Sequence, residues 1–430
     1  MAGLALQRYL QRHSEDGLPP APGGRARWRH SLVIPAYRES AAALQGLEQL
    51  SRGGVPLLLI LVLNRPDSDP DPGANADLRR ALGQLRPREQ ASLYRLDEHT
   101  DLYALDTELL CGPLPAARGV GLARKLGCDL ALQWMHAGAI ASDWLCSTDA
   151  DATLPADYFL QLDGAPTGAV AATFPFAHTA SGEAPCDTAT ALYELSLHYY
   201  VLGLEYAGSP YAFHTLGSCL AFRAGAYAQV RGFPRRAAAE DFYLLNKLAK
   251  LGPVARLRGQ AVQLRSRYSD RVPFGTGPAV AQISRARVPL DAPLFYHPQC
   301  FECLRALLEA LPDLREAGAD LPALLHRSGL DTDTADACSD ILQTMGLEAA
   351  LRHCRQHGRG AQQFLRQFHQ WFDAFRSLKF IRALRQRRWP SQALHALAAQ
   401  SPPLLPAMRG PGQDIDRLLR ATRRRWWQTT

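Results

Sequence analysis

Runs of almost uninterrupted apolar residues constrain the fold of this chain most strongly. They are "SLVIPAY" at 31–37, "VPLLLILVLN" at 55–64, "SLYRL" at 92–96, "WLCSTDAD" at 144–151 and "AVAATFPF" at 169–176. Helical patterns separate them, the clearest at 119–138. A strand that is apolar at every position is buried on both faces, which is typical of a parallel sheet covered by helices. The sequence therefore predicts an α/β fold with a mostly parallel, Rossmann-like sheet flanked by helices.

The composition changes at about residue 286. Leu, Ala, Gln and Arg dominate from there on, and proline separates amphipathic helix patterns. A chain of 430 residues also exceeds one typical hydrophobic core. We therefore predict an N-terminal helix and linker over 1–30, the α/β domain over 31–285, and an α-helical C-terminal region over 286–430.

The charge, the cysteines and the hydropathy limit the surroundings of the protein. A formal charge of +7 suits anionic partners. Nine scattered cysteines indicate reduced thiols in a cytoplasmic protein, and the single C-x-x-C of Cys300 and Cys303 is weak evidence for zinc. The longest apolar run, 55–63, is about half the length that spans a bilayer. With no signal peptide evident, we expect a soluble or peripheral protein.

Two carboxylates follow the fourth apolar run. Asp149 and Asp151 stand with one residue between them, where the strand is expected to end. In parallel sheets, ligands bind beyond the carboxyl ends of the strands. Mg²⁺ or Mn²⁺ takes oxygen ligands, often one or two carboxylates together with substrate phosphates. The alternative is an ordinary turn, in which Asp is common.

A second acidic pair opens a predicted helix over 240–252. Glu240 and Asp241 precede its apolar face. An ionised Asp241 in this place is a candidate general base. Acidic residues also stabilise helix starts through the helix dipole, so a purely structural role remains open.

Two further segments are candidates for binding phosphate. The segment "RSRYSDR" brings together Arg265, Arg267 and Arg271, whose guanidinium groups suit the oxygens of a diphosphate; a solvated basic loop is the alternative. The G-x-G of "RGVGLARKLG" at 118–127 follows no predicted strand, so a helix start is the better interpretation.

Taken in order, five segments resemble the motifs of the family-two glycosyltransferases of the GT-A fold. They are "LVIPAYRES", "GVGLARKLG", "STDAD", "GSCLAFR" and "GFPRRAAAEDFYLLNKL". They cover roughly residues 31–252, and their agreement in order is far more specific than any one alone. The resemblance implies a GT-A domain that transfers a sugar from a nucleotide-diphosphate-sugar donor to an acceptor hydroxyl with inversion.

The resemblance also implies roles for individual residues. Asp241 would take the proton of the acceptor hydroxyl, and Asp151, with Asp149 beside it, would hold Mn²⁺ or Mg²⁺ against the diphosphate. The metal would stabilise the charge of the leaving diphosphate as a Lewis acid. The remaining residues expected to bind the nucleotide-sugar are Pro35, Ala36, Tyr37, Glu39, Asn64, Arg124, Asp149, Glu240, Arg265 and Arg267.

The chain departs from the family pattern in three places. The second strand ends on Asn64, where the family usually has Asp, so the preferred donor base is open. The segment "QRRW" at 386–389 is one residue shorter than the Q-x-x-R-W of polymer-forming members, and no membrane helix accompanies it. His214 and His297 are candidates for an additional metal ligand, although a lone histidine is more often structural.

Two other functions remain as alternatives: a nucleotidyltransferase of similar fold, and a catalytically silent nucleotide-sugar-binding module. The first usually has a Gly-rich loop after the first strand, which "PAYRESAAA" lacks. The acceptor is unknown, and 178–215 and the helical tail are expected to select it. The tail "RATRRRWWQTT" suits an anionic membrane surface, with a frayed, solvated terminus as the alternative. No nucleic acid is expected as a partner.

Overall fold

The structure is a computed structural model that describes residues 2–23, 27–47, 54–88, 90–269, 275–399 and 415–427. The chain forms two compact units. The first unit consists of Met1–Asp187, Thr215–Ala281 and Arg423–Thr430. The second consists of Thr188–His214 and Gln282–Thr422.

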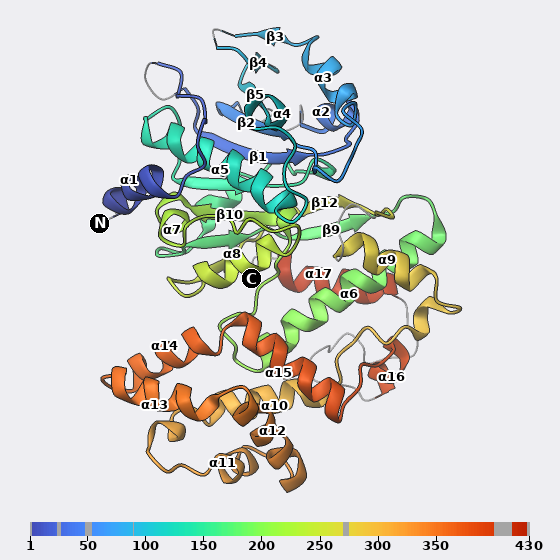
Figure 1. The fold of residues 1–430 in the computed structure, drawn as a ribbon. Helices are drawn as coiled ribbons and strands as arrows, with labels where there is room; N and C mark the ends of the chain where they lie inside the picture. The colour runs from blue at the N-terminus through green and yellow to red at the C-terminus, as the bar shows by residue number, and fades with distance from the viewer. Residues whose placement is uncertain are drawn as a thin grey trace. The chain divides into compact units, whose positions relative to one another are not determined.

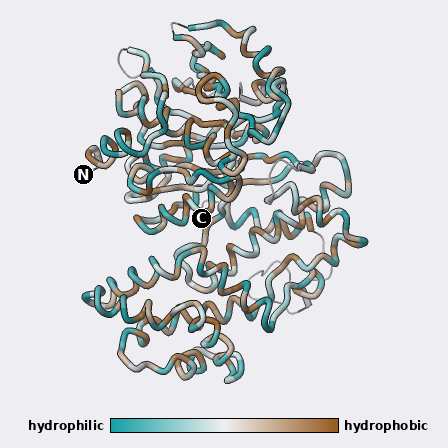
Figure 2. Tube along the Cα trace, in the orientation of Figure 1, coloured by the Kyte–Doolittle hydropathy of each residue, from teal (hydrophilic) through white to brown (hydrophobic). Residues whose placement is uncertain are grey.

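A mostly parallel core of four strands organises the first unit. Strand β1 (His30–Ala36) lies between β2 (Leu57–Leu63) and β6 (Trp144–Ser147), and β5 (Thr100–Asp106) lies on the far side of β2, all parallel. All residues of β2 are buried, and Figure 2 shows the hydrophobic colouring of these central strands. The predicted α/β fold with buried parallel strands is confirmed.

Shorter strands extend this core. Within the described residues the larger sheet has nine strands in the order β11-β8-β10-β6-β1-β2-β5-β4-β3. The five peripheral strands are β3 (Arg86–Pro87), β4 (Leu93–Arg95), β8 (Ala171–Thr173), β10 (Leu220–Arg223) and β11 (Val254–Arg256). A smaller described sheet joins β7 (Ala152–Thr153), β12 (Val262–Arg265) and β9 (Phe176–Thr179).

Two strand predictions need correction. The run 92–96 forms only the three-residue β4, antiparallel to β5, and the strand that completes the parallel core is β5, which the sequence patterns did not reveal. Its polar start hides it: Asp101 is buried, and it accepts from Trp28 Nε1 at 3.0 Å and Arg88 Nε at 2.9 Å. The run 169–176 is divided between β8 and β9, which belong to different sheets.

The helix α5 (Gly119–His136) packs on β1, β2 and β6. Figure 1 shows it beside β1. It confirms the helix predicted at 119–138. The predicted helix around Leu44 and Leu47 is α2 (Ala42–Leu47), whereas Leu50 lies outside the described residues. Among the described residues, the other helices that begin in the first unit are α1 (Ala2–Arg12), α3 (Ala76–Leu82), α4 (Thr107–Leu110), α6 (Ala184–Tyr206), α7 (Ala224–Gln229), α8 (Glu240–Leu248) and α9 (Thr276–Ser284).

A buried polar cluster fastens α1 to α5. The ammonium group of Lys125 donates to Asp129 Oδ2 at 2.7 Å, to the Tyr9 hydroxyl at 2.6 Å and to the carbonyl of His13 at 2.8 Å. Asp129 also accepts from the hydroxyls of Tyr9 and Tyr227, at 2.6 and 3.1 Å. A buried carboxylate is stable only when its charge and lone pairs are compensated in this way.

The second unit is helical. Its helices include α10 (Pro298–Glu309), α11 (Leu321–Arg327), α12 (Thr332–Thr344), α13 (Leu347–His357), α14 (Ala361–Trp371), α15 (Ala374–Arg387) and α16 (Leu394–Ala399). Aspartate side chains cap α11, α12 and α15. Most of α6 also belongs here, so much of the segment 178–215 is a 23-residue helix, which the sequence analysis did not predict.

We expect Asp129→Ala to destabilise the protein by about 3–5 kcal/mol. The buried Lys125 ammonium would keep only Glu15, 3.6 Å away, as a counter-charge, and the hydroxyls of Tyr9 and Tyr227 would lose their acceptor. Urea unfolding followed by circular dichroism measures this. Asp336→Ala is the matched control, since Asp336 is exposed on α12, and its effect should stay within about 0.5 kcal/mol. Equal stability of the two variants would show that the cluster does not hold α1 in place.

Candidate active site

The candidate site lies where the parallel strands of the first unit end. β1 runs in register with β2, Ala36 opposite Leu63, and Val33 lies opposite Ser147 of β6. The carboxyl ends of these strands therefore share one edge of the sheet, which is where ligands bind in open α/β folds. The residues that follow these strands, Tyr37 to Glu39, Asn64, and Asp149 to Asp151, are consequently brought to this edge.

The guanidinium group of Arg124 is the centre of this edge. It projects from α5, is 2% exposed, and donates from Nε to Glu240 Oε1 at 2.9 Å and from Nη1 to Ser147 Oγ at 2.8 Å. Its Nη2 pairs with Asp149 Oδ1. Burial opposes the charge of Arg124, but Asp149 and Glu240 raise the pKa of the guanidinium, so it stays protonated.

Gly217 leaves the space that this arrangement needs. A Cβ atom at Gly217 would lie 2.4 Å from Nη2 of Arg124. The next residue, Ser218, donates its hydroxyl to Asp149 Oδ2, and its carbonyl accepts from Thr148 Oγ1 at 2.9 Å. The Gly-Ser pair of "GSCLAFR" thus admits the arginine and holds the first aspartate of "DAD".

A second glycine places the start of α8. A Cβ atom at Gly121 would lie 2.4 Å from the carbonyl oxygen of Pro234 and 2.6 Å from that of Arg236. The amide of Gly121 donates to the Arg236 carbonyl at 3.0 Å. The segment that leads to Glu240 can therefore lie directly on the first turn of α5. Arg124 lies further along the same helix.

Asp241 has an unusual acidity for a carboxyl group. Burial raises its pKa to about 7, and the negative charge of Glu240 contributes in the same direction. The amide of Phe242 donates to Asp241 Oδ1 at 2.6 Å and acts in the opposite direction, as does Arg124. A carboxyl group with a pKa near neutrality is suited to accept and release a proton.

Asp151 belongs to a second, more open ion cluster. Its Oδ2 lies 2.5 Å from Nη2 of Arg267, and the same nitrogen lies 3.9 Å from Oε1 of Glu39. The side chains of Asp151 and Arg267 are 26% and 37% exposed. Arg267 thus connects the residues after β1 with those after β6.

The carboxylates at this edge are candidate ligands for a divalent cation. In the described residues, no group of three or more His, Cys, Asp or Glu side chains is arranged to hold a metal. Both carboxylate oxygens of Asp149 are bonded, to Arg124 and Ser218, although its side chain is 35% exposed. Asp151, 26% exposed, is paired with Arg267. One carboxylate plus substrate phosphates is a usual way of binding Mg²⁺.

The residues after β1 and β2 are held by a separate network. The Tyr37 hydroxyl donates to Asp69 Oδ2 at 2.7 Å, and Arg38 binds both oxygens of Asp69, at 2.8 and 3.0 Å. These bonds hold the pKa of Asp69 well below its usual range, and those from Arg38 have the largest effect. The Asn75 side chain donates to the carbonyl of Asn64 at 3.0 Å and accepts from the amide of Arg38 at 3.0 Å.

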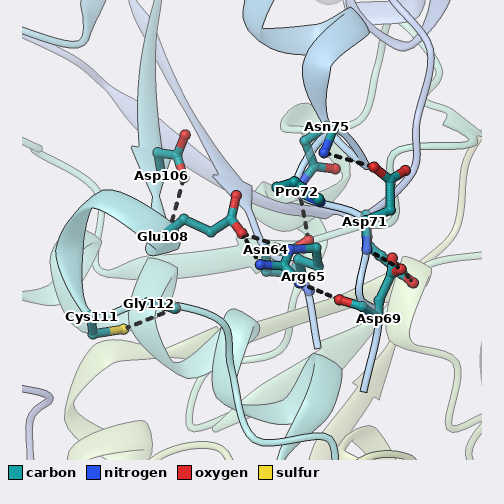
Figure 3. A network of polar contacts seen from close by, with 12 residues as sticks. Asn64, Arg65, Asp69, Asp71, Pro72, Asn75, Asp106, Glu108, Cys111 and Gly112 are labelled. Carbon is teal, nitrogen blue, oxygen red and sulfur yellow. Dashed lines mark hydrogen bonds and ion pairs between the residues drawn. The ribbon is translucent and has the colours of Figure 1, made fainter. Parts of the chain in front are cut away.

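Figure 3 shows how Arg65 continues this network. It lies between Glu108, to which its Nε donates at 2.6 Å, and the carbonyl of Asp69. In the amide orientation that satisfies its neighbours, Asn64 donates to the carbonyls of Ala36 and Val62 at 3.2 and 3.3 Å. Pro35 and Ala36 are the last two residues of β1, beside this amide.

Other sequence candidates are not brought to the site. Arg265 is an exposed residue at the end of β12, and among the described residues it forms no ion pair with Asp149 or Asp151. His214 faces His198, with Nε2 and Nδ1 3.0 Å apart, and His297 caps α10 by accepting from the amide of Gln299. Arg271 lies outside the described residues.

The C-terminal tail is helical over its described part. Residues Ile415–Trp427 form α17, so the frayed terminus is a wrong description of this segment. The side chains of Trp426 and Trp427 lie outside the described residues. In the described part of the chain, no helix is both long and apolar enough to cross a membrane.

Sequence reasoning missed Ser147, Ser218 and Asp69 as parts of the site. Ser147 and Ser218 stand inside quoted motifs, beside Thr148 and Gly217, so a closer comparison of the motifs could have indicated them. Asp69 lies in a polar loop with several other aspartates, and only its bonds to Tyr37 and Arg38 distinguish it. The sequence carries no signal for those bonds.

The acidity of Asp241 predicts how stability depends on pH. Because its pKa is raised from 3.8 to about 7, the folded protein holds this proton more tightly than the unfolded chain. Its contribution to stability is full below pH 4 and is lost as the pH rises through 7. We therefore expect Asp241→Asn to gain stability relative to the wild type as the pH rises from 4 to 8.

Urea unfolding of both proteins at several pH values measures this difference. Asp336→Asn serves as the control, because Asp336 is exposed and should show no such trend. A constant difference between Asp241→Asn and the wild type from pH 4 to 8 would contradict the raised pKa.

Comparisons with known proteins add little to this geometry. No protein-family model matches the chain, and no curated protein matches its sequence. Among solved structures, one match is the mannosyltransferase PcManGT from Pyrobaculum calidifontis in complex with GDP-Man and Mn²⁺, with 18% identity, 88% of this chain and 94% of that chain covered, and a TM-score of 0.35. Another is S. aureus TarS 1-349, with 12% identity, coverage of 92% and 91%, and a TM-score of 0.33. Likenesses this weak support no statement about the activity of this chain.

Proposed function

We propose that this protein is a metal-dependent, inverting glycosyltransferase of the GT-A type that uses a nucleotide-diphosphate-sugar donor. The observation that carries the proposal is the convergence of the five motif segments. Arg124, Asp149, Ser218 and Glu240 come from four of them and form one bonded cluster. Glu39, from the fifth, shares Arg267 with Asp151. Chance matches to short motifs have no reason to meet at one sheet edge.

Each cluster has a distinct role in this proposal. Arg124 fixes Asp149 and the start of α8, and so positions Asp241. Asp241 takes the proton of the acceptor hydroxyl as its oxygen attacks the sugar and the bond to the diphosphate breaks. Arg267 and Glu39 border the diphosphate and the nucleoside, with Tyr37 and Asn64 at the base. A divalent cation, Mn²⁺ or Mg²⁺, would be held by Asp151 and would neutralise the charge of the departing diphosphate.

The alternatives differ in what the protein releases. A nucleotidyltransferase releases pyrophosphate from a nucleoside triphosphate, and a silent binding module releases nothing. A glycosyltransferase slowly releases nucleoside diphosphate from its donor even when water replaces the acceptor. That residues 178–215 and the helical tail select the acceptor, and that the tail contacts an anionic membrane surface, remain predictions.

Asp151→Ala should abolish donor cleavage. The full-length protein is incubated with Mn²⁺ and a panel of nucleotide-sugars, and release of nucleoside diphosphate is measured. A metal contributes several kcal/mol to such a leaving group, so we expect a loss of about 10²-fold or more. Asp336→Ala should retain the wild-type rate. Wild-type protein that binds and cleaves none of the donors would overturn the proposed function.

Asp241→Asn should separate catalysis from binding. Loss of a general base typically costs about 10²–10⁴-fold in rate. We expect kcat for donor cleavage to fall by that amount, while the Kd of the donor with Mn²⁺, measured by calorimetry, changes little. If the donor affinity falls as much as the rate, Asp241 is part of the binding site and not the base.

A further inference from the structure

A basic cavity of about 480 Å³ lies in the first unit. It is formed by the end of α1, by Lys125 of α5 and by the segment that follows α7. Its charged lining residues include Arg12, Asp16, Lys125, Arg231 and Arg235. None of them belongs to the site around Arg124 and Asp151, although Lys125 follows Arg124 directly on α5.

The cavity lining has more cationic side chains than carboxylates that pair with them. Arg12 and Arg231 are exposed, and among the described residues neither pairs with a carboxylate. Arg235 is paired with Glu15 at 2.8 Å, and the Lys125 ammonium is satisfied by Asp129. Asp16 is the carboxylate among the described lining residues. Two guanidinium groups are therefore free to bind an anion.

The pKa of a neighbouring lysine, Lys247, is lowered. The ammonium group of Lys247 donates to the carbonyl of Val230 at 2.9 Å and lies 3.4 Å from that of Gly232. Burial lowers its pKa, and the cations of Lys125 and Arg231 lower it further. Lys247 therefore lies close to Arg231, and the nearby cations add to the effect of burial on its pKa.

The backbone of Arg231 has an unusual, left-handed conformation. Its φ is 64°, a left-handed conformation that favours glycine or asparagine and costs an arginine about 1–2 kcal/mol. Gly232, with a φ of 70°, follows it. This turn directs the Arg231 side chain into the lining of the cavity, and Lys247 holds the carbonyls on either side of it.

We propose that this cavity binds a small anion that carries a phosphate group, at a site separate from the donor site. Guanidinium groups bind phosphate oxygens in pairs, with charge-assisted hydrogen bonds. The volume falls in the range of small-molecule sites, about 300–1,000 Å³, and leaves room for more than a bare phosphate ion. A phosphomonoester therefore fits better than inorganic phosphate.

Isothermal titration calorimetry of the full-length protein tests this proposal. Glycerol 3-phosphate and inorganic phosphate are titrated separately, in EDTA and without any nucleotide-sugar, so the result does not depend on donor chemistry. The Arg12→Gln/Arg231→Gln variant is compared with the wild type. The matched control is Arg8→Gln/Arg86→Gln, which removes the same charge from exposed arginines outside the cavity.

We expect binding to the wild type, stronger for glycerol 3-phosphate, at least tenfold weaker binding to the cavity variant, and a change within twofold for the control. Absence of binding to the wild type would overturn the proposal. So would an equal loss in both double variants, which would indicate unspecific attraction to net charge. If Arg267→Gln instead abolishes binding while the cavity variant retains it, the anion binds at the donor site and the proposal is wrong.

Discussion

The buried guanidinium group of Arg124 is the interaction on which the site depends. It brings a positive charge to a place from which water is excluded, and Asp149, Glu240 and Ser147 compensate it. Removing one member of a buried ion pair leaves the other charge uncompensated, at a cost of about 3–5 kcal/mol. The end of β6, the start of β10 and the start of α8 are therefore fixed relative to one another by α5.

This arrangement gives the two aspartates of "DAD" different roles. Asp149 has both oxygens bonded within the protein and serves as part of the scaffold. Asp151, two residues later, is outside that scaffold and pairs with Arg267, whose side chain is more exposed than that of Arg124. An ion pair at the surface is worth little, so a ligand with its own charges can replace it at small cost. The sequence analysis predicted that both carboxylates hold the metal. The bonds of Asp149 to Arg124 and Ser218 are the reason that our proposal gives this role to Asp151.

The sequence predicted those parts of the fold that depend on local patterns. The strands β1, β2 and β6 and the helices α5 and α8 follow from apolar runs and helical periodicity, and the five motifs indicated most of the residues that meet at the sheet edge. The strand β5 was missed because Asp101 makes it look polar, and that charge is neutralised by Arg88, a residue from another segment. The same holds for Asp69: its partners are 31 and 32 residues away in the chain, and no local pattern reveals such pairs.

Arg124 and Lys125 are consecutive residues of α5 that belong to two different networks of charged side chains. The first network contributes to the acidic sheet edge, and the second lies beside the basic cavity. Arg124 is drawn into the protein by carboxylates, and it leaves no charge for a ligand. The ammonium group of Lys125 is likewise bonded within the protein, to Asp129 and Tyr9. Its network holds α1 beside α7, so that Arg12 and Arg231 line the same cavity. The buried charges thus act as scaffold on both sides of the helix. The groups that we propose to bind ligands are the partly exposed Asp151 and Arg267 at the sheet edge, and the exposed Arg12 and Arg231 at the cavity. This division follows from desolvation, since a charge that must be buried must also be paired, whereas a charge that is to bind a ligand has to remain accessible.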